Sequence, residues 1–246
     1  MVLLNLQKTI MNDLQTTLDS LIKSGTESNP ALNKLLIDYT NYHLVFVIVG
    51  SLFLFGFLTL SIFFLRRFKN TQKTDNNNWP FAKKTYFWFG LLSVLVGFFL
   101  VLLVMANVSN AVHPRQGFLG TISMLSPPAP NTPTFKLHKD INAWLQSDRA
   151  KTPELLQNRV DERLAWQRPK AIICIVLLAV FVVLSFYTWR KLLSGRFIAV
   201  EWTTKELLLF ATGIILVIVC LLLMLMVLGN TQASLAPISL TLFYSN

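Results

Sequence analysis

Apolar residues along this chain gather in four long blocks that contain no Asp, Glu, Lys, Arg or His. A helix needs about 20 mostly apolar residues to cross about 30 Å of hydrocarbon. Each block meets that length, and each is bordered by charged residues. The pattern therefore predicts an all-α integral membrane protein with four transmembrane helices, at 44–65, 85–112, 170–189 and 207–229.

The segments between these spans differ in length and in character. The predicted organisation is an extracellular amphipathic region 1–43, a cytoplasmic basic loop 66–84, an extracellular Pro-rich and helical loop 113–169, a cytoplasmic loop 190–206 and an extracellular tail 230–246. Residues 1–25 lack the uninterrupted apolar stretch of a signal peptide, so we expect the mature chain to begin at Met1.

The N-terminal region has the spacing of an amphipathic helix. Between residues 3 and 22, apolar side chains recur at steps of three and four, at Leu3, Leu6, Ile10, Leu14, Leu18 and Leu21. Asn29 followed by Pro30 is typical of an N-cap and a first helical residue. No helix breaker follows before Arg66, so one helix is expected to run from Pro30 through the first span.

The long loop 113–169 divides into two parts. Its first part contains five prolines and two glycines, including Pro114, Gly117 and Gly120, and is expected to be extended or irregular. Its second part is expected to be helical, with a face formed by Leu137, Ile141, Trp144 and Leu145 and a further helix start at Thr152–Glu154. Pro169 permits a kink or a fresh helix start. These helices and the N-terminal helix predict a small extracellular cap. The apolar tail is expected to be packed rather than free.

The distribution of Lys and Arg predicts the orientation. The two short loops hold ten basic residues against three acidic ones, whereas the remaining segments hold twelve against nine. Basic residues in short loops mark the cytoplasmic side. We therefore expect a multi-pass protein of the cell membrane with both termini extracytoplasmic. Four tryptophans are expected at the inner interface: Trp79, Trp88, Trp189 and Trp202.

Composition agrees with this class of protein. Of the 246 residues, 53% are hydrophobic and 14% are charged, about half the charged share of soluble domains. The formal net charge of +10 would suggest nucleic acid as a partner of a soluble protein. Here the positive charge is expected against anionic lipid instead. The expected partners are the lipid bilayer and other membrane subunits or a second copy of the chain, and no nucleic acid.

The four spans contain few side chains that could take part in catalysis or in coupled transport. Proton relays and charge-coupled transport need ionisable side chains at depth, and the four blocks have none. We find no catalytic motif and expect a non-enzymatic protein with no cofactor and no metal. His43 and His113 are the candidate cofactor ligands, because both are expected at the outer boundary, where imidazoles can bind haem or metal. The competing interpretation is that they are ordinary interfacial histidines.

Small residues in the first two spans predict helix packing. Gly90, Ser93 and Gly97 share one face of the second span, and Gly50 and Gly56 lie in the first. Small side chains let helix backbones approach closely in lipid. An alternative is that this face lines a pore or forms a hinge.

Three functional hypotheses follow. The first is a non-enzymatic subunit of a membrane assembly, with channel formation by an oligomer as one version of it. The second is a membrane redox, haem-binding or metal-binding subunit that uses the outer-face histidines. The third is a membrane sensor with an extracellular helical cap. The sequence favours the first, because the spans are uncharged and the outer helices need partners.

Overall fold

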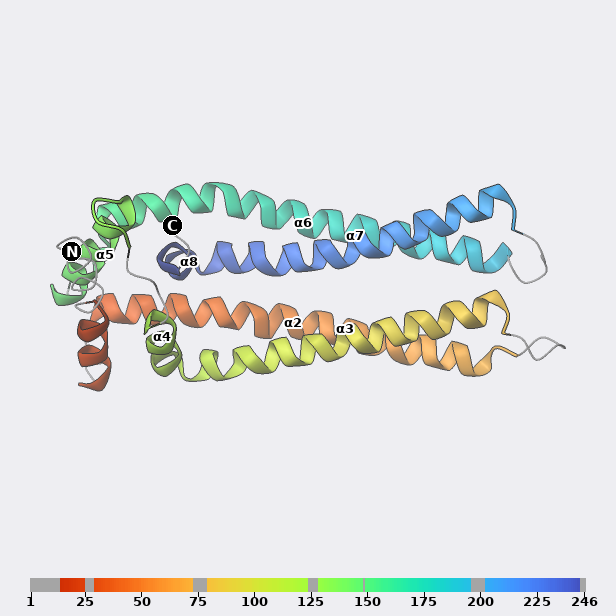
Figure 1. Ribbon diagram of the computed structural model, residues 1–246, viewed down its shortest axis with the longest axis horizontal. Coiled ribbons are helices and arrows are strands. Elements are labelled where there is room, and N and C mark those ends of the chain that lie inside the picture. The colour runs from red at the N-terminus through yellow and green to blue at the C-terminus, as the bar shows by residue number, and fades with distance from the viewer. Residues whose placement is uncertain are drawn as a thin grey trace. The chain divides into compact units, whose positions relative to one another are not determined.

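The computed structural model describes residues 14–24, 29–72, 79–123, 128–147, 149–195 and 202–243. Those residues form helices and connecting segments, with no strand among them (Figure 1). Residues 14–23 are helical, and seven labelled helices follow: α2 (Pro30–Asn70), α3 (Phe81–Val112), α4 (Pro114–Ser123), α5 (Pro133–Gln146), α6 (Glu154–Gly195), α7 (Thr204–Leu235) and α8 (Pro237–Phe243).

Four of these helices are long and apolar enough to cross a membrane: α2, α3, α6 and α7. Their ranges contain the four predicted spans, which confirms the all-helical class of a multi-pass membrane protein. The helices also extend beyond the apolar blocks. In α6 the chain continues as one helix through Pro169, so the fresh helix start considered at that proline does not occur.

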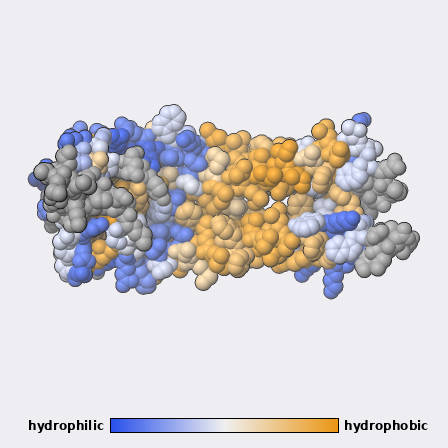
Figure 2. Space-filling model, in the orientation of Figure 1, coloured by the Kyte–Doolittle hydropathy of each residue, from blue (hydrophilic) through white to orange (hydrophobic). Residues whose placement is uncertain are grey.

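The chain divides into two compact units. The terminal unit, as we call it, comprises residues 1–47, 105–169 and 230–246, and the span unit comprises residues 48–104 and 170–229. The span unit is covered mainly by hydrophobic residues on the face that Figure 2 shows. Each unit is described separately below.

The terminal unit has a hydrophobic core of its own. The predicted helical face in the second part of the long loop is confirmed, because Leu137, Ile141, Trp144 and Leu145 of α5 are all buried. Leu14 and Leu18 belong to the same core, whereas Leu3, Leu6 and Ile10 lie outside the described residues. The C-terminal tail is packed, as expected, since Ile238 and Leu242 of α8 also join this core.

Polar caps fix the ends of the helices. The Asn29 side chain accepts a hydrogen bond from the Leu32 amide at 2.9 Å, as the predicted N-cap of α2 should. Its amide group also donates to the Leu145 carbonyl at 2.8 Å, which ties the start of α2 to the end of α5. Thr203 and Glu206 form a reciprocal capping box at the start of α7.

The expectation of irregular structure after residue 113 is wrong for Pro114–Ser123, which forms α4. Proline is favoured at the first helical position because its fixed φ suits a helix and no amide is needed there. Gly117 serves close packing rather than a turn. A Cβ atom on it would lie 2.6 Å from Asn110 Oδ1 and 2.8 Å from the Tyr39 hydroxyl oxygen.

Candidate functional site

The two candidate histidine ligands have different environments. His43 is buried, and its Nδ1 donates to Asn107 Oδ1 over 2.7 Å. The rings of Tyr39 and Tyr42 pack edge-on against it, with centroids at 4.5 and 5.0 Å. His113 lies between α3 and α4 and is exposed. His43 is therefore a packed, hydrogen-bonded side chain.

Metal ligation requires several suitable side chains at one place. Within the described part of the chain, no group of three or more His, Cys, Asp or Glu residues is placed to hold a metal ion. Neither Cys174 nor Cys220 takes part in a disulfide bond.

All five small packing residues belong to the span unit, and four of them are buried. Gly50, Gly90, Ser93 and Gly97 are buried. A Cβ atom on Gly50 would lie 3.1 Å from Val104, and one on Gly90 would lie 3.3 Å from Leu65, so α2 and α3 approach closely at both positions. One on Gly97 would meet Leu54 at 3.9 Å.

Gly56 has a different position from the other four. It is exposed, and a Cβ atom built on it would meet no atom within 4 Å. The small residues therefore fall into two groups: four that are buried and one, Gly56, that faces outward.

Replacing Gly90 with leucine is expected to destabilise the span unit, because the added side chain would meet Leu65 and Phe64. Overpacking of this kind costs about 1–3 kcal/mol. Gly56→Leu is the matched control, since it gives the same gain in helix propensity without the collision. Thermal unfolding in detergent should show a lower midpoint for Gly90→Leu than for Gly56→Leu. Equal midpoints would contradict the packing.

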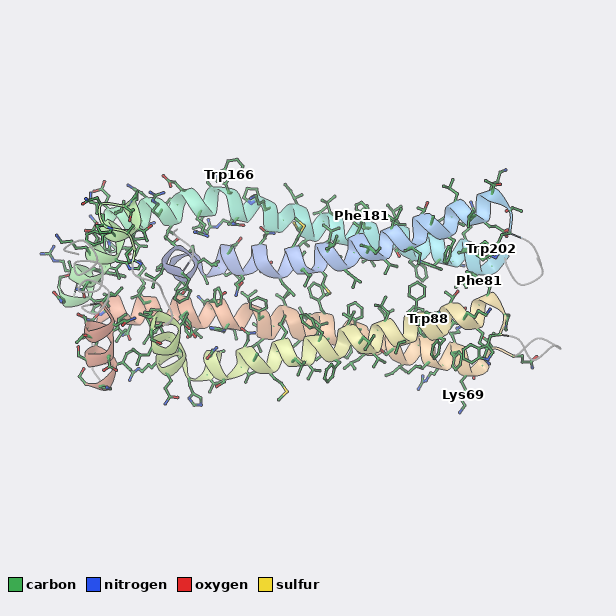
Figure 3. All side chains as sticks on the ribbon, in the orientation of Figure 1. Lys69, Phe81, Trp88, Trp166, Phe181 and Trp202 are labelled. Atoms are coloured by element: carbon green, nitrogen blue, oxygen red, sulfur yellow. The ribbon has the colours of Figure 1, made fainter. Side chains whose placement is uncertain are left out.

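Aromatic side chains organise one end of the span unit. Trp189 is buried, its ring centroid lies 4.6 Å from that of Phe89, and its indole nitrogen donates to the Gly213 carbonyl at 3.3 Å. A Cβ atom on Gly213 would lie 3.0 Å from that indole, so only glycine allows this approach. Trp202 packs edge-on against Phe81 at 5.0 Å (Figure 3). Trp189 is thus a packing residue, whereas Trp88 is 64% exposed.

His138 in the terminal unit is buried, which the sequence pattern did not predict. His138 of α5 is 2% exposed, and neither ring nitrogen has a hydrogen-bond partner among the described residues. Burial lowers the pKa of His138 below its ordinary value of 6.5, because the charged imidazolium loses its hydration.

The terminal unit should therefore lose stability in mild acid. Below pH 6.5 the unfolded chain takes up a proton that folded His138 resists, so stability falls as pH drops from 6.5 towards the lower folded pKa. His138→Leu should flatten this part of the profile. Denaturant unfolding at pH 7.5 and pH 5 tests this, with the exposed His113→Leu as the control. An unchanged slope in His138→Leu would contradict the assignment.

A second residue that the sequence did not reveal is Asp38 of α2. Its buried carboxylate accepts hydrogen bonds from the Ile238 amide at 3.3 Å and the Ser239 amide at 2.6 Å. These amides belong to the first turn of α8, where Pro237 has no amide hydrogen and Ala236 has no capping side chain. Asp38 thus caps a helix that lies 200 residues away in the sequence.

An open cavity of about 880 Å³ lies within the terminal unit. It is lined by Arg159, Glu162, Arg163 and Gln167 of α6, by residues 132–134 at the start of α5 and by Thr241 of α8. Arg163 Nε donates to Thr241 Oγ1 at 3.2 Å, which holds the guanidinium group at the wall. Sequence spacing alone could have grouped Arg159, Arg163 and Gln167, which are four residues apart.

Comparisons of the chain with protein-family models, with curated proteins and with solved structures found no match.

Proposed function

We propose that this protein is a non-enzymatic subunit of a membrane assembly, formed with other membrane subunits or with further copies of itself. The observation that carries the proposal is the outward position of Gly56. In lipid, helices associate through close packing at small residues, because lipid tails cover apolar side chains as well as another helix does. Gly56 offers such a place on α2 that the chain's own helices leave open.

The surface around Gly56 supports this use. Its helix neighbours Leu52 and Phe55 are 67% and 74% exposed, and the side-chain hydroxyl of Thr59 is already bonded to the Phe55 carbonyl. A second helix could therefore place its backbone against Gly56 between two large apolar side chains. Moreover, only 11% to 22% of the most apolar 18-residue stretch of each span is buried within the chain. Most of each stretch is therefore available to lipid or to partner helices.

The test compares particle mass in a mild detergent for the parent, Gly56→Leu and Gly90→Leu. Gly56→Leu should reduce the mass of the assembly while the midpoint of thermal unfolding is kept. Gly90→Leu should lower the midpoint, because its clash is internal. If the parent runs as a single chain in native-like nanodiscs, or if Gly56→Leu keeps the parent mass, the proposal fails.

The proposal includes an orientation, with both termini and the terminal unit outside the cell and the N-terminal amphipathic helix forming part of an extracellular cap. The excess of Lys and Arg in the two short loops supports this orientation. Single cysteines at Asn77 and Ser194 should resist an impermeant thiol reagent in intact cells, whereas one at Thr132 should react. Reaction at Asn77 with protection at Thr132 would reverse the orientation.

A further inference from the structure

We propose that the cavity of the terminal unit binds a phosphate-bearing ligand that also carries hydroxyl groups. The first support is its charge. Arg159 and Arg163 both line it and lie on one face of α6, four residues apart, against a single acidic lining residue, Glu162. Guanidinium groups match phosphate oxygens in geometry as well as in charge.

The two arginines are available for a ligand in different ways. The hydrogen bond from Arg163 to Thr241 uses Nε, so the η nitrogens of that guanidinium group are not part of it. Arg159 approaches Glu162 only to 3.6 Å, between side chains that are 46% and 71% exposed. A contact this long and this exposed is weak, so an incoming phosphate can replace it.

The start of α5 adds a second source of positive potential. Thr132 caps this 14-residue helix, and residues 132–134 line the cavity. The first turn of α5 contains no acidic residue. The partial positive charge of the helix N-terminus therefore lies beside the cavity uncompensated by a carboxylate, which favours an anion through the helix dipole, whereas the Phe135 amide already donates to Thr132 Oγ1.

The side chain of Gln167 is the reason for proposing that the ligand carries hydroxyl groups. Gln167 is one of the residues that line the cavity, and its side-chain oxygen is buried and has no hydrogen-bond partner among the described residues. Buried acceptors in folded proteins are nearly always paired. When the Gln167 amide turns towards the cavity, a hydroxyl group beside the phosphate would supply the missing donor. Trp166, which is 71% exposed, and Leu137 provide apolar lining next to these polar groups.

Two sources of such a ligand share this chemistry: the headgroup of an acidic phospholipid with hydroxyl groups and a soluble sugar or polyol phosphate. Gln167 comes four residues before Ala171, where the apolar stretch of the third span begins. Gln167 therefore lies about one helical turn outside the apolar stretch of α6. Lipid headgroups are found at this distance from the hydrocarbon. The cavity is also open, so a soluble phosphate can enter it.

The experiment measures binding of two probes to the full chain in nonionic detergent. Phosphatidylglycerol carries the phosphate and hydroxyl groups on a lipid, and glycerol 3-phosphate carries them in water. Native mass spectrometry counts retained lipid, and calorimetry measures the soluble probe. Phosphatidylcholine, which has the phosphate without the hydroxyl groups, is the comparison lipid.

We expect Arg159→Gln and Arg163→Gln each to weaken binding of the probe that the parent binds, roughly tenfold or more. Arg168 is exposed and lies outside the lining, so Arg168→Gln should leave this binding unchanged. Among the described residues Arg159 has only its long contact with Glu162, so Arg159→Gln remains informative if Arg163→Gln folds poorly. Arginine-dependent retention of phosphatidylglycerol identifies the headgroup as the source, and arginine-dependent binding of glycerol 3-phosphate identifies a soluble ligand. Equal binding by the parent and both variants, or equal retention of phosphatidylcholine, would overturn the proposal.

Discussion

Tyr39→Ala is expected to lower the free energy of unfolding of the terminal unit by about 3–5 kcal/mol, the usual cost of deleting a large buried aromatic side chain. Tyr39 is 1% exposed. Its ring contacts His43 of α2, Phe118 of α4 and Phe243 of α8, with centroids at 4.5, 5.3 and 6.4 Å. Removing it would open a cavity where three helices meet.

Tyr39→Phe is the matched control, because it keeps the ring and removes only the hydroxyl group. That hydroxyl lies 3.2 Å from Thr121 Oγ1, which also donates to the Gly117 carbonyl and so keeps a partner. The expected loss is about 1 kcal/mol. Denaturant unfolding of the three proteins measures the difference. Similar values for the alanine and phenylalanine variants would show that the ring does not join these helices.

How far the sequence predicted this fold depends on the range of the interactions involved. Local patterns were sufficient for the four apolar helices, for the buried face of α5 and for the Asn29 cap, since each is determined by residues within a few helical turns. The helix α4 was missed because proline and glycine usually interrupt helices. Here Pro114 starts the helix and Gly117 permits contact with Tyr39.

The cavity and the Asp38 cap could not be predicted because each joins distant parts of the chain. Arg163 meets Thr241 across 78 residues, and no local period marks that pair. Asp38 is a single acidic residue in an otherwise ordinary helical stretch. The opposite behaviour of Gly56 and Gly90 was also beyond the sequence, since both are small residues in apolar spans and only packing distinguishes them.

Asp38→Ala is expected to release α8 from the terminal unit. The substitution leaves the buried Ile238 and Ser239 amides without their acceptor, at a cost of roughly 2–5 kcal/mol for the two donors together. A helix of seven residues has little stability of its own and depends on its tertiary contacts. Hydrogen exchange of residues 238–243 should therefore become fast.

The control for this variant is Asp38→Asn, which keeps the size of the side chain and one carbonyl acceptor and should retain part of the protection. Residues 137–145 of α5 serve as the internal reference, because their buried face does not depend on Asp38. Fast exchange at 238–243 with α5 still protected indicates local release of α8. Fast exchange in both places indicates that the Asp38 contacts hold the whole terminal unit together, and unchanged exchange at 238–243 would refute the cap.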